Sequence, residues 1–393
     1  MVSLLRSIGF DGYRSFPCRR QYDRTQPLNT VELAPLTLLI GRNNAGKSSI
    51  AALLYQVLAG LAATEGTALP LTVAGQPVAE GFQDLLYARD ANTFLELDIA
   101  IGAGAARHHL NTILFLHSLL DDDIRPWAKA IEWDGEACPV AKAPLDKGLL
   151  PDTPQRAALQ DEARRVLQSS LWLGPLRAQV PETPPQAARS NRTPKITPSG
   201  EGVVGLLADD EGLFATVSDW LKRHAGFSLR WEKNLDLWRL KVVRGETRSL
   251  SITQMGAGIH QLLPVLTLAL WRKRCGGEAG YLDVIQQPEL HLHDALQPDL
   301  GDLFMDVALQ GRGVTVVETH AEGLLLRVRR RIAEGGISPE QVALYYVDDA
   351  PSGSQVRRIG LLANGEVDYW PAGVFLESFE EVKALRRAQR RVE

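Results

Sequence analysis

The feature that most constrains the fold is a glycine-rich segment near the N-terminus, Gly41-Arg-Asn-Asn-Ala-Gly-Lys-Ser48. It matches the pattern G-x-x-x-x-G-K-[ST] at every fixed position. The apolar run Leu36–Ile40 before it predicts a buried strand, and the helix-forming run Ser49–Leu58 after it predicts a helix that ends near Gly60. Strand, loop and helix in this order predict a phosphate-binding loop, because a chance glycine-rich turn lacks these flanks.

This loop predicts ATP as ligand and Mg²⁺ as its ion. The two glycines let the backbone curl so that its N–H groups face phosphate oxygens. Lys47 supplies a cation for the terminal phosphates, and the hydroxyl of Ser48 is a Mg²⁺ ligand. The predicted nucleotide-binding residues of the loop are Gly41, Asn43, Asn44, Ala45, Gly46, Lys47, Ser48 and Ser49.

The composition is that of a folded protein with a large core, with 45% hydrophobic and 23% charged residues. Its three cysteines are far apart, which argues against a zinc site or a disulfide framework. We find no leader pattern and no membrane-length apolar run, so we expect a cytoplasmic protein without membrane contact. The net charge of −4 argues against a uniformly basic nucleic-acid-binding coat, although local basic patches stay possible.

Three intervals of the chain have different patterns. We expect residues 1–150 to be the N-terminal part of an ATPase head with a β-rich subdomain, including the alternating strand Phe94–Ile101. Residues 151–250 read as a helical insertion, with helices over Asp152–Leu171 and Leu213–Arg223 and a mobile proline-rich loop over Arg177–Gly202. Residues 251–393 complete the head, and no heptad run predicts coiled-coil arms.

Further elements are predicted around these. Strands are expected at Phe227–Trp231, Leu237–Val243, Tyr281–Ile285 and Val314–Val317. The apolar run Gly258–Trp271 predicts a helix that Pro264 interrupts early.

A second motif lies at the start of that helix. Met255-Gly-Ala-Gly-Ile-His-Gln-Leu262 resembles the ABC signature L-S-x-G-x-x-Q, with matches at Gly258 and Gln261 and with Gly256 in place of the serine. Backbone amides at a helix N-terminus bind phosphate, so these three residues are predicted to contact ATP. The alternative is that Gly-x-Gly before a helix is only a bend.

A third motif, Tyr281-Leu-Asp-Val-Ile-Gln-Gln-Pro-Glu-Leu-His-Leu-His293, looks like a Walker B segment. The two positions before the proline, which hold a Mg²⁺-supporting acid and a water-positioning residue in such ATPases, are here Gln286 and Gln287. We predict them as catalytic residues, with Gln286 also facing Mg²⁺. An amide holds water but carries no charge, which leaves hydrolysis in doubt.

Two single residues complete the predicted site. His320 follows the strand Val314–Val317 and resembles the switch histidine that contacts the γ-phosphate, although a lone histidine there is usually structural. Gln83 is predicted to relay Mg²⁺ status, with a surface glutamine as the plainer alternative. A further polar group lies at the end of the Walker B-like segment and comprises His291, His293 and Asp294. These residues could be read as a metal site, but their position favours a D-loop region that faces a second subunit.

Together, these motifs resemble prokaryotic AAA/ABC-like ATPases related to the overcoming-lysogenisation-defect (OLD) family and to SMC-type heads, many of which accompany phage-defence operons. The segment Trp172-Leu-Gly-Pro-Leu-Arg177 adds to the resemblance. It implies an α/β P-loop NTPase of the ABC head type with a β-rich flank and a helical insertion. It also implies a homodimer that holds ATP between Lys47 of one subunit and Gly256–Gly258 of the other, and that switches a separate effector protein, a nuclease or another enzyme.

Several alternatives stay open. The related proteins carry glutamate at the position of Gln286, so the glutamine marks either a natively weakened site or an engineered change that traps ATP. The chain is accordingly an ATPase subunit, an inactive ATP-sensing scaffold, or a DNA-repair or DNA-clamp head. Two basic clusters are candidate contacts for nucleic acid or for an acidic partner, and they are equally compatible with solvated helix faces. The clusters comprise Arg327, Arg329, Arg330 and Arg331, and Lys383, Arg386, Arg387, Arg390 and Arg391.

Overall fold

The computed structural model describes residues 4–103, 106–117, 125–184, 196–234, 237–245, 248–275 and 280–371. At its centre is a six-stranded sheet with the strand order β10-β14-β15-β3-β16-β17, parallel except for the pair β16 and β17. Its strands are β10 (Trp172–Leu173), β14 (Leu282–Gln286), β15 (Val314–Glu318), β3 (Leu36–Gly41), β16 (Val342–Ala350) and β17 (Gly353–Ile359). Three of them, β3, β14 and β15, confirm predicted strands.

The central sheet is covered on both faces, which explains the unbroken apolar character of its strands. Along β3, Leu39 packs into one hydrophobic core, and its neighbours Leu38 and Ile40 pack into the other. The chain is therefore a mixed α/β protein, and the predicted phosphate-binding loop follows a strand in the middle of a buried sheet.

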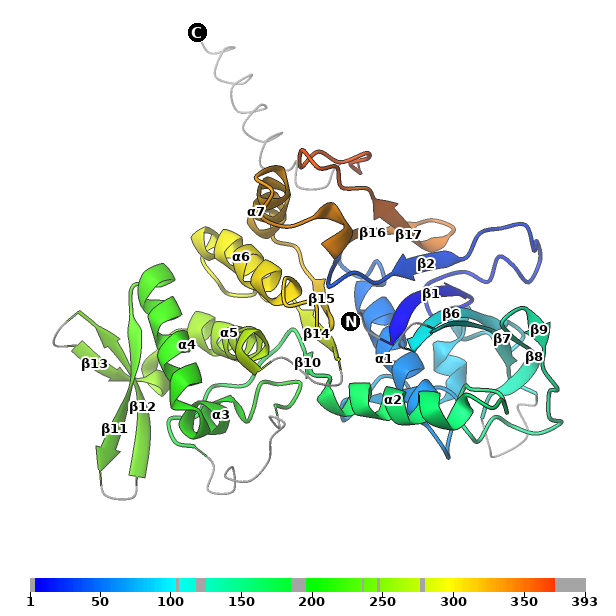
Figure 1. The fold of residues 1–393 in the computed structure, drawn as a ribbon, viewed down its shortest axis with the longest axis horizontal. Helices are drawn as coiled ribbons and strands as arrows, with labels where there is room; N and C mark the ends of the chain where they lie inside the picture. The colour runs from blue at the N-terminus through cyan, green and yellow to red at the C-terminus, as the bar shows by residue number, and fades with distance from the viewer. Residues whose placement is uncertain are drawn as a thin grey trace, which may run out of the picture.

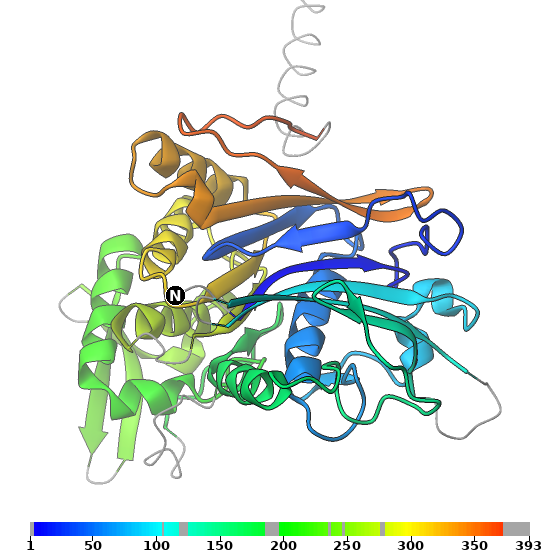
Figure 2. The ribbon, with the colours of Figure 1, turned by 45° about the vertical axis from the view of Figure 1, so that its right-hand side comes forward.

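One face of the central sheet packs against α1 (Lys47–Ala62) and a second, antiparallel sheet in the order β2-β1-β6-β7-β8-β9. Figure 1 shows α1 beside this second sheet, and Figure 2 shows its strands as a separate layer. The strands are β2 (Asn29–Glu32), β1 (Leu5–Asp11), β6 (Leu95–Ala103), β7 (Ala106–Phe115), β8 (Trp127–Trp133) and β9 (Glu136–Ala137). The predicted strand Phe94–Ile101 is confirmed as β6.

The helix α1 continues past Gly60 and ends at Ala62, close to the predicted end. A Cβ atom at Gly60 would lie 2.1 Å from the carbonyl oxygen of Ala68 and 2.8 Å from the side chain of Leu149. The glycine therefore lets two other segments approach the helix closely, and it does not end the helix.

The other face packs against α5 (Ala257–Cys275), α6 (Gln297–Ala308) and α7 (Glu322–Ala333). The expected interruption of α5 at Pro264 is wrong, because one helix runs through it. A proline inside a helix costs about 3 kcal/mol. Its neighbours Leu262, Leu263, Val265 and Leu266 are all buried, and each contributes roughly 1.5–3 kcal/mol by leaving water, so burial outweighs the lost hydrogen bond.

Residues 151–250, predicted as one helical insertion, contribute to two parts of the structure. The helix α2 (Arg156–Ser169) packs against α1, and β10 joins the central sheet. The remaining elements form an adjoining lobe with a three-stranded sheet, seen at the left of Figure 1. They are α3 (Val203–Asp209), α4 (Glu211–His224), β11 (Ser228–Asn234), β12 (Leu237–Arg244) and β13 (Arg248–Ser251).

The proline-rich loop has ordered ends. The Gly174 N–H donates to the Pro198 carbonyl and the Ala178 N–H to the Ser199 carbonyl, both at 2.8 Å. Residues 185–195 of this loop lie outside the described residues. Across the described part of the chain, none of the helices is both long and apolar enough to cross a membrane.

Candidate phosphate-binding site

The loop between β3 and α1 has the backbone shape that a phosphate cradle needs. Gly41 has a φ of 147° and Gly46 a φ of 103°, both in the region that favours glycine. A Cβ atom at Gly41 would lie 2.2 Å from the Val347 carbonyl oxygen, and one at Gly46 would lie 2.8 Å from the Phe16 ring. Gly46 also caps α1, so the unpaired amides of the first helical turn face the loop.

Lys47 lies folded over this loop. Its side chain is 97% buried, and its Nζ donates to the carbonyl oxygens of Gly41 at 3.0 Å and Arg42 at 2.6 Å. Burial lowers the pKa of Lys47, and the charges of Glu318 and Glu289 partly oppose this shift. The ammonium group is therefore held at the loop by acceptors that phosphate oxygens would replace.

Ser48 contacts a carboxylate that the sequence analysis did not single out. Its Oγ lies 3.0 and 2.8 Å from the two carboxylate oxygens of Glu318, and the amide of Gln286 donates to the same carboxylate at 2.8 Å. Gln286 and Glu318 are register partners at the carboxyl ends of β14 and β15, where parallel sheets place ligands. An acidic residue at the end of a predicted core strand was the available signal.

Gln287 has a strained backbone, with a φ of 44°, which is uncommon for a residue with a side chain. Its N–H donates to the Glu318 carbonyl at 2.7 Å. Such strain is often retained at functional turns. The structure therefore places both predicted glutamines at the end of β14, next to the phosphate loop.

His320 carries an unpartnered polar atom. Its Nε2 is buried and has no hydrogen-bond partner among the described residues. Its backbone N–H and the Thr319 hydroxyl donate to Glu289, at 2.6 and 2.9 Å. Burial, and secondarily the charge of Lys47, lowers the pKa of His320 to about 4, so the imidazole is neutral near pH 7. A buried polar atom normally has a hydrogen-bond partner, so this ring nitrogen beside Lys47 is a candidate ligand contact.

Arg177 joins this site to the signature-like segment. Its guanidinium donates to the carbonyls of Gln286 at 2.6 Å and Gln287 at 3.4 Å, and burial lowers its pKa to about 10. Its backbone exchanges two hydrogen bonds with the Gln261 amide, at 3.2 and 2.9 Å. The side-chain amide of Gln261 is therefore hydrogen-bonded within the chain. Its contact with the ATP of a second subunit stays a prediction, and that contact would require the hydrogen bonds with Arg177 to break.

The signature-like glycines lie at the start of α5. Gly256 is exposed, and a Cβ atom there would meet nothing within 4 Å. A Cβ atom at Gly258 would lie 2.9 Å from the carbonyl oxygen of His291, so the helix start abuts the turn after β14. In that turn, His293 Nδ1 accepts the Ala295 N–H at 3.2 Å, which gives this histidine a capping role.

Gln83 lies in a short 3₁₀ helix, Phe82–Leu85, whose last carbonyl accepts the Arg14 N–H at 2.9 Å. Its side-chain amide donates to the carbonyl of Arg89 at 2.8 Å. The amide is thus engaged locally, and its predicted Mg²⁺ relay stays a prediction.

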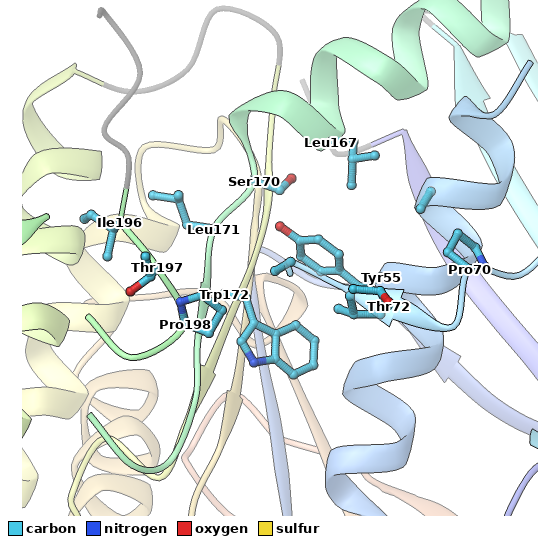
Figure 3. A pocket seen from close by; sticks show the side chains of 13 residues that line it. Tyr55, Pro70, Thr72, Leu167, Ser170, Leu171, Trp172, Ile196, Thr197 and Pro198 are labelled. Carbon is cyan, nitrogen blue, oxygen red and sulfur yellow. The ribbon is translucent and has the colours of Figure 1, made fainter. Parts of the chain in front are cut away.

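A cavity of about 580 Å³ lies away from the phosphate loop, between α1, the end of α2 and β10 (Figure 3). Tyr55 and Trp172 form part of its wall, with their ring centroids 5.5 Å apart. Among the described residues that line it, none is charged. The cavity therefore offers no counter-charge for a triphosphate.

The arginines of α7 are engaged within the chain. Arg327 and Arg331 pair with Asp302, Arg330 pairs with Glu334, and Arg329 donates to the Gly365 carbonyl at 2.9 Å. The second basic cluster lies outside the described residues. Its members are Lys383, Arg386, Arg387, Arg390 and Arg391.

The fold is similar to that of SMC head domains. One similar structure is an SMC head bound to the C-winged helix domain of ScpA, with 14% identity, a TM-score of 0.56, and coverage of 91% of this chain and 98% of that one. A second is an Smc head with an extended coiled coil, bound to the C-terminal domain of ScpA derived from Pyrococcus furiosus, with 11% identity, a TM-score of 0.53, and coverage of 97% and 99%. No protein-family model matches the sequence, and no curated protein matches it.

Proposed function

We propose that this chain is an ATP-binding head of the ABC type. The observation that carries the proposal is the curled Gly41–Ser48 loop, with the buried Lys47 on it and the unpartnered His320 nitrogen beside it. The loop amides and Lys47 bind the phosphates, and His320 contacts the terminal phosphate. The Ser48 hydroxyl is a ligand for Mg²⁺, which supplies positive charge to the phosphates when it is bound.

We further propose that ATP closes a homodimer. The exposed start of α5 at Gly256 supports this, because its free amides suit a phosphate that a second subunit presents. Closing and opening the dimer would switch a partner. Both similar SMC heads are bound to parts of ScpA, and by analogy this chain would act on a separate effector protein, in antiphage defence if the OLD resemblance extends to function.

The substitution Gly256→Asp tests the dimer. The site is open, so we expect the variant to fold and bind ATP as the unaltered protein does. Its carboxylate would repel the partner's phosphate, so light scattering after gel filtration should show an ATP-dependent dimer for the unaltered protein and only monomer for the variant. Gly256→Ala is the control and should still dimerise. A dimer of Gly256→Asp at unchanged ATP concentration would contradict the proposal.

A second candidate is an ATP-sensing scaffold that does not turn over. The observation that favours it is the pair Gln286 and Gln287, which gives the end of β14 no carboxylate to accept a proton.

The substitution Gln287→Glu separates the two candidates. It restores a general base at the water-positioning site, so an ATPase with an intact site should release phosphate roughly 100-fold faster, as general base catalysis typically contributes. Gln287→Met is the control of similar size and should stay slow. If Gln287→Glu binds ATP and still releases no phosphate above this control, the scaffold is the correct function.

A third candidate is a DNA-repair or DNA-clamp head. The arginines of α7 give it little support, because Arg327, Arg330 and Arg331 are already paired with acidic residues of the chain. Salt-dependent binding to duplex DNA that is lost when Arg386 and Arg390 are neutralised would favour it.

A further inference from the structure

The end of β14 carries no charge, yet a carboxylate stands beside it. Glu318 ends the neighbouring strand β15, and its side chain is almost completely buried. Both of its oxygens lie within hydrogen-bond distance of Ser48 Oγ, and one accepts the Gln286 amide. The acid is thus one strand away from the position where the sequence motif leads one to expect it.

Burial makes this carboxylate notable. A buried carboxylate is unfavourable unless a cation or several donors compensate for it. The charge of Lys47 acts on Glu318, but the hydrogen bonds of the Lys47 ammonium go to two loop carbonyls. Among the described residues, the hydrogen-bond partners of the Glu318 carboxylate are a hydroxyl and an amide, both neutral. This site therefore favours an additional cation.

The identity of Gln286 fits the same arrangement. A glutamate here would put a second carboxylate at about the 2.8 Å that now separates the Gln286 amide from Glu318. Two carboxylates so close do not both ionise without a proton or a metal. The amide instead donates to Glu318 and fixes its orientation next to Ser48. Gln286 therefore supports the neighbouring acid.

Magnesium needs little more from a protein than this. It prefers oxygen ligands and binds nucleotide sites through one or two carboxylates together with phosphates and waters. Among the described residues, no group of three or more histidine, cysteine, aspartate or glutamate side chains could hold a metal ion by itself. A single carboxylate beside the loop serine therefore suits a cation that arrives with phosphates.

We propose that Glu318 is the carboxylate that binds the Mg²⁺ of Mg·ATP in this chain, and that Gln286 positions it. The Mg²⁺-binding carboxylate of this chain thus lies at the end of β15, whereas the Walker B-like motif would place it at the end of β14. This proposal rests on the proposed ATP-binding function and assigns its Mg²⁺ binding to a residue outside the Walker B-like motif.

Calorimetric titration of ATP, with Mg²⁺ and with EDTA, tests the proposal without any measurement of turnover. For the unaltered protein, Mg²⁺ should strengthen ATP binding at least tenfold. Glu318→Gln should bind ATP equally well with and without Mg²⁺, and its affinity in EDTA should be unchanged or higher because a negative charge is gone. Glu322→Gln, an exposed carboxylate at the start of α7, is the matched control and should keep the full Mg²⁺ effect.

The exchange variant Glu318→Gln with Gln286→Glu returns the charge to β14 and should regain most of the Mg²⁺ effect. Glu318→Asp keeps the charge, so it should retain part of the effect and decides the matter if Glu318→Gln fails to fold. An unchanged Mg²⁺ effect in Glu318→Gln, or none in both Glu318→Asp and the exchange variant, overturns the proposal. Failure of the unaltered protein to bind ATP both with Mg²⁺ and in EDTA instead overturns the proposed function.

Discussion

Replacing Lys47 with alanine is expected to weaken ATP binding about 100-fold and to abolish the ATP-dependent dimer. Removing one partner of a buried, charged hydrogen bond costs about 2–5 kcal/mol, and about 3 kcal/mol corresponds to 100-fold in affinity. Lys47 is the cation on the loop, and its present acceptors are carbonyls of the loop itself. Calorimetric titration with ATP measures the affinity, and light scattering measures the dimer.

Loss of fold is tested separately by the thermal unfolding midpoint of Lys47→Ala, which should stay well above the temperature of the titration. Lys273→Ala, an exposed lysine that pairs with Asp306, is the control and should bind ATP normally. If Lys47→Ala binds ATP within threefold of the affinity of the unaltered protein, the Gly41–Ser48 loop is not the ATP-binding site.

The second large effect concerns stability. Arg272→Met is expected to lower the free energy of unfolding by about 3–5 kcal/mol, because it leaves the buried carboxylate of Asp283 without its cation. The two side chains are 1% and 2% exposed, and two hydrogen bonds of 2.7 Å join them. The guanidinium also lies over the ring of Tyr281, with its carbon 3.9 Å from the centroid. Urea unfolding measures the change.

Lys273→Met provides a control on the next residue of α5. Its ion pair with Asp306 is nearly half exposed, so its loss should change the free energy of unfolding by less than about 1 kcal/mol. Arg272→Met combined with Asp283→Leu should recover much of the lost stability, because no unpaired charge then remains. Equal losses for Arg272→Met and Lys273→Met would show that the buried pair has no special role.

This ion pair also supports the candidate site. Asp283 accepts the Leu171 N–H at 2.8 Å, and Arg272 donates to the Ser169 carbonyl, so the pair joins α5 and β14 to the chain that enters β10. That chain continues to Arg177, which binds the carbonyls at the end of β14. A weakened pair should therefore also loosen the strand that carries Gln286.

The sequence predicted best the features that are defined by neighbouring residues. The strand, loop and helix around Lys47 were predictable, because a phosphate loop is defined by consecutive residues. The break at Pro264 was predicted wrongly, because that argument used backbone preferences alone. Burial of the neighbouring apolar side chains explains why the helix runs through Pro264, and the close approach of Ala68 and Leu149 explains the glycine at position 60. Tertiary packing commonly overrides such preferences.

The sequence by itself determined the loop motif Gly41–Ser48, core strands at β3, β14 and β15, and two glutamines where an acid was expected. Only the tertiary structure decided the strand order and which side chains meet, because pairing between distant segments leaves no local pattern. The register of β14 and β15 sets Gln286 beside Glu318, and packing joins Arg177 to Gln261. Only the folded chain therefore shows that the neutral Gln286 and the carboxylate of Glu318 belong to one site.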